Sequence, residues 1–181
     1  ESLAIDALLN YPHSVATTTN RIFIADANNN RIRRVDLTDG TISTVAGSGT
    51  ATYDDGGGGP GSTWLASLNY PTDVAVDAAG NLYIADTNNN RIRKVDFSDY
   101  SISTVGGNGT AGYTGDNGPA IEASLNSPFG VAVDAAGNIF IADMYNNVIR
   151  KIDTLGTITT VAGSGLYDFS GDGFSATAAG M

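Results

Sequence analysis

The sequence predicts an all-β protein, a β-propeller with three four-stranded antiparallel blades in the chain. The first observation is a strand–turn–strand pattern over 81–96, in which apolar residues alternate with polar ones on both sides of an Asn-rich turn. The second is that the same pattern recurs over 21–36 and 138–153. A faithful internal repeat built from short strands is typical of a propeller.

Each repeat starts at a proline. Pro12, Pro71 and Pro128 are separated by 59 and 57 residues. A short apolar strand follows each proline, and two repeats continue with an Asp-Ala-Ala-Gly-Asn turn over 77–81 and 134–138. Asp opens such a turn and Gly accepts the positive φ that the turn requires, so each of these two turns predicts a hairpin.

A fourth strand closes each repeat, and its alternation of apolar residues with Ser or Thr suits a half-exposed outer strand. We therefore expect one domain over 1–181, in which long Gly-rich connections join the blades and rise on the same face as the Asn-rich turns. That face is the candidate binding surface. The expected blades are blade 1 at about 9–47, blade 2 at about 68–107 and blade 3 at about 125–163.

Three blades cannot close a ring, because propellers typically need 4 to 8. Met181 aligns with Leu125, Leu68 and Leu9, so the chain holds three whole repeats, and residues 1–9 correspond to the end of a connection. We expect a head-to-tail homodimer that closes a six-bladed ring. The alternatives are that the chain is half of a longer closed propeller, or that its open blades pair without closing and form polymers.

The repeated text resembles the NHL-repeat family of β-propellers, in its long-repeat bacterial and cell-surface form. The matching motifs are Leu-Asn-x-Pro, Val-Ala-Val-Asp-x-x-Gly-Asn and Tyr-Ile-Ala-Asp-x-x-Asn-Asn-Arg-Ile-Arg-Lys-Val. The histidine that gives the family its middle letter is replaced here by Asn30, Asn90 and Asn147, and Val148 stands where the other repeats have Arg. The resemblance implies an interaction platform.

Composition excludes several function classes. The net charge is −10, from 19 acidic and 9 basic residues, which disfavours nucleic-acid binding because phosphate contacts need basic side chains. No window approaches the roughly 18 apolar residues of a membrane span, so membrane insertion is not expected. Without cysteine there is no disulfide or thiolate metal site. Low Lys content and abundant Thr, Asn, Gly and Tyr favour a secreted or cell-surface location.

Two recurring sets of charged residues have structural interpretations. Asp26, Asp86 and Asp143 precede the Asn-rich turns, and we expect them to accept backbone N–H bonds rather than to bind a cation. The basic residues of the third strands are expected to form salt-bridged rims around the blades. Neither pattern predicts a metal ion or a cofactor.

The candidate ligand-binding residues belong to two groups. His13 follows Pro12 where Thr72 and Phe129 stand in the other repeats, a position near the mouth of a central channel. Exposed aromatic residues on the loop-bearing face form the second group, although they could instead pin the loops to the blades. These are Trp64, Tyr113 and Tyr145.

These features predict a non-enzymatic binding scaffold for a protein or a glycan, with no catalytic residue assigned. The alternatives are a channel-centred lyase or hydrolase that uses His13 with carboxylates, and a structural protein that assembles with itself.

Overall fold

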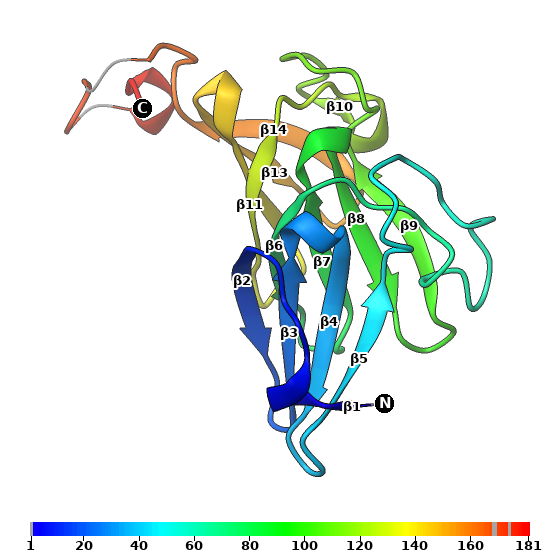
Figure 1. Ribbon diagram of the computed structural model, residues 1–181. Coiled ribbons are helices and arrows are strands. Elements are labelled where there is room, and N and C mark those ends of the chain that lie inside the picture. The colour runs from blue at the N-terminus through cyan, green and yellow to red at the C-terminus, as the bar shows by residue number, and fades with distance from the viewer. Residues whose placement is uncertain (1, 168–169, 174) are drawn as a thin grey trace.

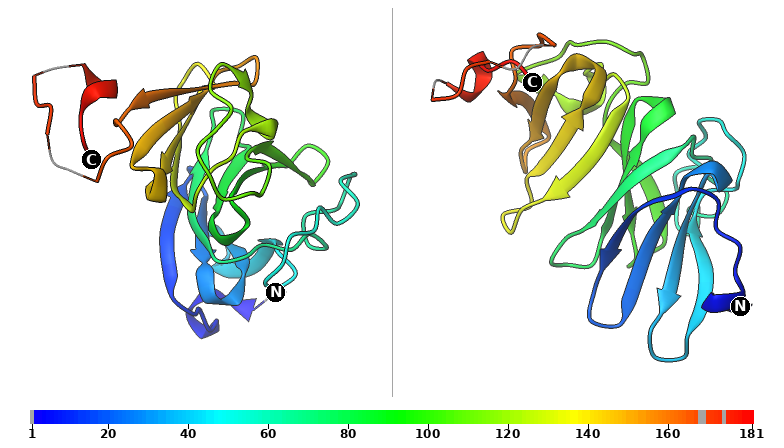
Figure 2. Two further views of the ribbon diagram at one scale, coloured as in Figure 1. Left: turned by 90° about the horizontal axis from the view of Figure 1, so that it is seen from above. Right: turned by 60° about the vertical axis from the view of Figure 1, so that its left-hand side comes forward.

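The protein is described by a computed structural model that covers residues 2–167, 170–173 and 175–181. Three antiparallel sheets of four strands lie side by side as a fan (Figures 1 and 2), which confirms the all-β class and the three four-stranded units. The first sheet comprises β2 (Pro12–Thr17), β3 (Arg21–Asp26), β4 (Arg31–Asp36) and β5 (Thr41–Ala46). The second comprises β6 (Pro71–Val76), β7 (Leu82–Asp86), β8 (Arg91–Asp96) and β9 (Ser101–Gly106). The third comprises β11 (Pro128–Val133), β12 (Ile139–Asp143), β13 (Val148–Ile152) and β14 (Thr157–Ala162).

Two sheets carry a fifth strand that the sequence pattern does not reveal. β1 (Ser2–Leu3) pairs with β5, and β10 (Gly118–Pro119) pairs with β14 in the equivalent register. The 3₁₀ turns η1 (Ala4–Asp6) and η4 (Ala120–Glu122) follow these two strands, and η6 (Ala176–Ala178) is a third turn of this kind. Residues 2–9 therefore fold like the end of the connection between the second and third sheets.

The Asn-rich turns explain why a glycine follows each outer strand. They form the 3₁₀ turns η2 (Ala27–Asn29), η3 (Thr87–Asn89) and η5 (Met144–Asn146), each ended by an asparagine with left-handed backbone geometry. At Gly107, a Cβ would lie 2.2 Å from the carbonyl oxygen of Asn90. This close approach excludes any side chain there, and Gly47 and Gly163 make the same contact in their own sheets.

The hydrophobic core lies between neighbouring sheets, because each sheet buries one face against the next. One cluster joins the first and second sheets, and the other joins the second and third. At the centre of the fan, the inner strand β6 packs against both of the other inner strands, β2 and β11. Within the described residues, no helix is long and apolar enough to cross a lipid bilayer.

Candidate binding surface at the centre of the loop-bearing face

The loop-bearing face is organised by a buried aspartate at the end of the second strand of each sheet. Asp86 accepts the backbone N–H of Asn69 at 2.8 Å and the side-chain amide of Asn89 at 2.9 Å. Asp26 and Asp143 accept the equivalent pairs of bonds in the other sheets. The expectation that these carboxylates accept backbone N–H groups is confirmed. They tie each Asn-rich turn to the residues just before the first strand.

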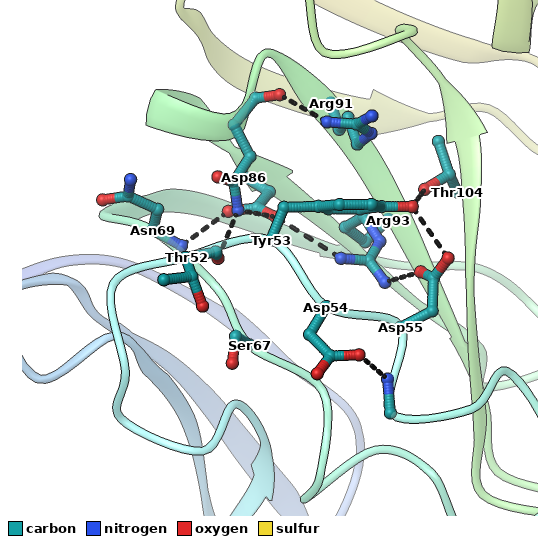
Figure 3. Close-up of polar contacts among 12 residues, drawn as sticks. Thr52, Tyr53, Asp54, Asp55, Ser67, Asn69, Asp86, Arg91, Arg93 and Thr104 are labelled. Carbon is teal, nitrogen blue, oxygen red and sulfur yellow. Dashed lines mark hydrogen bonds and ion pairs between the residues drawn. The ribbon is translucent and has the colours of Figure 1, made fainter.

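The third strands place two arginines inside the protein rather than at its rim. The guanidinium groups of Arg93 and Arg150 are fully buried, so the predicted rim position is wrong for these two residues, although both form salt bridges as predicted. Arg93 bridges Asp86, at 3.5 Å, and Asp55 of the preceding loop (Figure 3). A buried charge is costly unless it is paired, and each arginine satisfies this requirement by recruiting a loop carboxylate.

Arg150 repeats this arrangement in the third sheet. It contacts Asp143 at 3.5 Å and Asp116 of the preceding loop at 2.7 Å. Burial raises the pKa of the Asp86 carboxyl to about 6, because lost hydration outweighs the hydrogen bonds that it accepts. Burial raises the pKa of Asp143 for the same reason.

Two loop tyrosines fasten the connections to the sheets beneath. The centre of the Tyr53 ring lies 3.7 Å from the guanidinium carbon of Arg91, and the Tyr53 hydroxyl donates to Asp55 at 2.7 Å. The hydroxyl of Tyr113 lies 2.8 Å from that of Thr160. For Tyr113 the pinning interpretation therefore describes the observed contacts.

Four aromatic side chains from three repeats meet where the inner strands begin. The ring of His13 lies 5.2 Å from that of Phe129, 5.6 Å from that of Tyr70 and 4.9 Å from that of Tyr11, edge-on in each case. Nε2 of His13 is 3.2 Å from the Tyr70 hydroxyl. We call Tyr11, His13, Tyr70 and Phe129 the axial aromatic cluster. Tyr11 and Phe129 keep exposed ring surface.

The other residues predicted to contact a ligand have different surroundings. Thr72 is buried, and its hydroxyl donates to the Phe129 carbonyl at 2.7 Å, so it holds the Phe129 backbone rather than facing a ligand. Tyr145 is exposed, and its backbone N–H donates to the carbonyl of Asn126, just before β11. Trp64 is exposed but lies on the outer rim, where the adjacent Thr63 donates to the Tyr100 carbonyl.

Sequence reasoning missed Tyr11 and Tyr70, although both precede the repeat proline in a Leu-Asn-Tyr-Pro motif. Both adopt positive φ, 55° and 54°, which directs the chain sharply into the first strand. Among the described residues, no group of three or more His, Cys, Asp or Glu side chains has the geometry to hold a metal ion. The contacts of His13 described above are all aromatic.

Comparison with known proteins agrees with this geometry. The family model for the NHL repeat matches residues 9–35 and 68–95, and the model for the teneurin NHL domain matches residues 106–178. The chain belongs to the NHL-repeat family.

Curated relatives extend this assignment across most of the chain. The chloroplastic protein SUPPRESSOR OF QUENCHING 1 of Arabidopsis thaliana is 34% identical over 92% of this chain and 15% of its own length. Teneurin-1 of Gallus gallus is 39% identical over 50% of this chain and 4% of its own length. A solved Bacteroides thetaiotaomicron protein of unknown function is 26% identical, with a TM-score of 0.69 over 83% of this chain and 38% of its own. This NHL-repeat chain thus spans a small part of the curated relatives that it matches.

The replacement of the family's histidine by asparagine in the Asn-rich turns has a structural explanation in this chain. Asn30 and Asn90 adopt left-handed backbone geometry, which asparagine tolerates better than most residues. The side-chain oxygen of Asn30 accepts the backbone N–H of Tyr70 at 2.9 Å, and Asn90 accepts that of Ser127 at 2.9 Å. Asparagine at this NHL position therefore bonds one sheet to the next.

Proposed function

We propose that this NHL-repeat chain is a non-enzymatic binding module that offers its loop-bearing face to a partner protein, with the axial aromatic cluster at the centre of the contact. The observation that carries the proposal is the cluster itself, in which rings from three repeats converge and leave Tyr11 and Phe129 exposed. Aromatic residues are enriched at the energetic centres of protein interfaces.

The loops around the cluster are held in advance of binding. Arg93 and Arg150 each join a buried aspartate of the sheet to a carboxylate of the preceding loop. A surface that is already ordered loses less conformational entropy when a partner binds, which favours affinity. The buried ion pairs therefore support a recognition role for this face.

Charge indicates which partner segment suits the surface. The chain carries a net charge of −10, and two of its nine basic residues are withdrawn into the interior as Arg93 and Arg150. Three aspartates, Asp26, Asp86 and Asp143, are fully buried as well, so the solvent-facing charge stays strongly acidic. We propose a partner segment that is neutral or basic around an apolar or aromatic anchor, and whose association slows as salt rises.

A channel-centred lyase or hydrolase receives no comparable support. A general base needs a partner that orients it and activates it. Nε2 of His13 lies beside the Tyr70 hydroxyl at 3.2 Å, and the rings around it belong to Tyr11, Tyr70 and Phe129. A secreted or cell-surface location stays a proposal too, since one relative is named as chloroplastic.

The test is an array of peptides, protein domains and glycans probed with the wild-type chain and with matched variants. Phe129→Ser and Tyr145→Ser should each lower the affinity for a protein ligand by at least tenfold, the usual loss at an aromatic anchor. Leu155→Ser, in the exposed turn between β13 and β14, and Trp64→Ser, on the outer rim, should leave it unchanged. Binding to glycans alone, or equal loss in all four variants, would refute the proposal.

A further inference from the structure

The fan has two open faces, one on the first sheet and one on the third sheet. Each open face resembles one side of the junctions at which neighbouring sheets pack inside the fan. Val74 and Val131 are 4% and 6% exposed at the internal junctions, whereas the equivalent Val15 is 63% exposed. At the other end of the fan, Ile149 is partly buried, whereas the equivalent Ile92 is completely buried. Each chain therefore presents, unpaired, both surfaces of a junction that it forms twice within itself.

A shallow apolar groove marks this surface on the third sheet. It is lined by Phe129, Met144, Ile149 and Met181, together with Asn147. At the internal junctions the residue equivalent to Met144 is buried, as Ala27 in the first sheet and Thr87 in the second, where it packs beside the inner strand of the next sheet. The groove lies where a following first strand would pack.

A hydrogen bond fixes the register at each internal junction, and its two halves recur at the open ends. Asn30 accepts the N–H of Tyr70, and Asn90 accepts that of Ser127. The equivalent acceptor is Asn147, and the equivalent donor is the N–H of Tyr11. Neither group makes this bond with any residue that the structure describes.

Charge is complementary at the same two ends. The buried arginines of the second and third sheets each contact a carboxylate of the preceding loop. Arg33, their equivalent in the first sheet, pairs with Asp26 at 3.7 Å, with no second carboxylate among the described residues. Asp172 follows a glycine in the loop after the third sheet, as Asp116 does in the loop before it. Asp172 is thus the carboxylate that the pattern assigns to an arginine in a following sheet.

We propose that the first sheet of a second copy of this chain docks on the open face of the third sheet. Asn147 then accepts the N–H of Tyr11 of the second copy, and Asp172 pairs with its Arg33. The contact is head to tail, so two copies make it twice and close a ring. Six sheets lie within the 4 to 8 that propellers contain.

One segment of the chain stands in the way of this contact. A Cβ at Gly107 would lie 3.1 Å from Cδ1 of Leu125, and a Cβ at Gly163 would lie 3.0 Å from Cε of Met181. Met181 thus holds the place that Leu125 holds at the internal junction. Leu9 is the equivalent of both and would enter the same place from a second copy, so Leu9 and Met181 compete for one position.

The contacts of Leu9 decide which segment moves. Its neighbours are fixed to the first sheet on both sides, since Ala4 donates to the Gly40 carbonyl at 2.8 Å and Asn10 donates to Asp26 at 2.7 Å. Residues 4–9 therefore travel with the docking sheet. Residues 176–181 must leave, so they act as a self-cap that weakens association until they are displaced.

Ring closure would also complete the axial aromatic cluster. Tyr11 and His13 of the second copy would come beside Phe129, on the side of it that faces no further sheet within one chain. The cluster would then have two equal halves, related by the two-fold axis. This consequence concerns the site of the proposed function, whereas the association itself is independent of any ligand.

Sedimentation velocity over a concentration series tests the proposal without a ligand. We expect a reversible species of twice the 18.6 kDa of one chain. Leu9→Asp should weaken association at least about 100-fold, because it buries an unpaired charge. Met181→Asp should strengthen it roughly tenfold, because it loosens the competing cap. Leu9 and Met181 are 37% and 43% exposed, so both variants should fold.

A mixing experiment tests the head-to-tail geometry. Val15→Asp removes one face and Met144→Asp removes the other, so each variant alone should be monomeric. An equimolar mixture should recover a 1:1 dimer through the remaining intact pair of faces. Ile5→Asp is the matched control, since Ile5 is 91% exposed and its equivalent Ile121 stays 56% exposed at an internal junction.

Several outcomes would overturn the inference. The first is that the wild-type chain and the Met181→Asp variant both stay monomeric, and the second is that the Leu9 and Met181 substitutions have equal effects on association. Formation of open-ended polymers in place of a dimer would contradict ring closure. A Val15→Asp variant that still dimerises would contradict the assigned face. Circular dichroism and thermal unfolding of each variant separate loss of association from loss of folding. A chain that dimerises but binds nothing on the array would contradict the proposed function alone.

Discussion

Removing the carboxylate of Asp55 should release the loop between the first and second sheets. Asp55 contacts the guanidinium of Arg93, which is fully buried, and also accepts the Tyr53 hydroxyl at 2.7 Å. In an Asp55→Ala variant, Arg93 keeps only the Asp86 carboxylate at 3.5 Å. A hydrogen bond to a charged group contributes about 1.5–3 kcal/mol. Because the Asp55 side chain is 41% exposed, solvent screening places the expected loss near the middle of this range, at about 2 kcal/mol.

Thermal and urea unfolding would measure this loss. For a chain of this length, about 2 kcal/mol corresponds to a fall in Tm of roughly 4–8 °C. Hydrogen exchange should quicken at the amides of Gly56 and Ser67, which donate within the loop. Asp116→Ala should have a similar effect, because Asp116 contacts Arg150 in the same way at 2.7 Å.

Asp54→Ala is the matched control for this prediction. Asp54 is the neighbour of Asp55 in the same loop, but its carboxylate accepts the N–H of Gly56 at 2.8 Å and no arginine (Figure 3). We expect a loss of less than about 1 kcal/mol from it. If Asp55→Ala destabilises the protein no more than Asp54→Ala does, the buried ion pair does not hold the loop and the reasoning fails.

Two further predictions concern backbone geometry and pH. Gly107→Ala should cost about 3 kcal/mol in urea unfolding, because the new Cβ would meet the Asn90 carbonyl at 2.2 Å with φ at +86°. Gly57→Ala, at φ +90° with open space around it, should cost only about 1 kcal/mol. The raised pKa of Asp86 means that the folded state takes up a proton between about pH 4 and 6. The free energy of unfolding should therefore fall by roughly 3 kcal/mol as pH rises through this window, relative to an Asp86→Asn variant, and a flat difference between the two would contradict it.

The architecture could be predicted from the sequence because its signal is local and repeated. Alternation of apolar and polar residues over 81–96 sets the faces of β7 and β8, and the Asn run between them sets the turn. Repetition removes the ambiguity that a single short strand would leave. The buried turn aspartates were predictable for the same reason, since Asx residues in such positions commonly accept backbone N–H bonds.

The buried arginines could not be predicted from strand alternation, because burial there depends on a distant loop. Arg93 lies beside a register shift between β8 and β9 and opposite the buried Ile84 on β7. Its charge is tolerated because Asp55, 38 residues away in sequence, reaches it. The sequence signal that could have indicated these buried ion pairs is a pair of spacings that occurs in two repeats. Arg93 and Arg150 each follow a strand-end Asp by seven residues and a loop Asp by more than thirty.

The differences among the repeats show why the open junction differs in chemistry from the internal ones. Thr87 donates to the Pro128 carbonyl across an internal junction, whereas its equivalent in the third sheet is Met144. Asp73 accepts the Val131 N–H across the same junction, whereas its equivalent there is Gly130. The open face of the third sheet therefore lacks both polar contacts that align the internal sheets, because Met144 is apolar and Gly130 has no side chain. A face with fewer polar side chains loses less hydration when a second copy covers it, so it suits a junction that forms between separately folded copies.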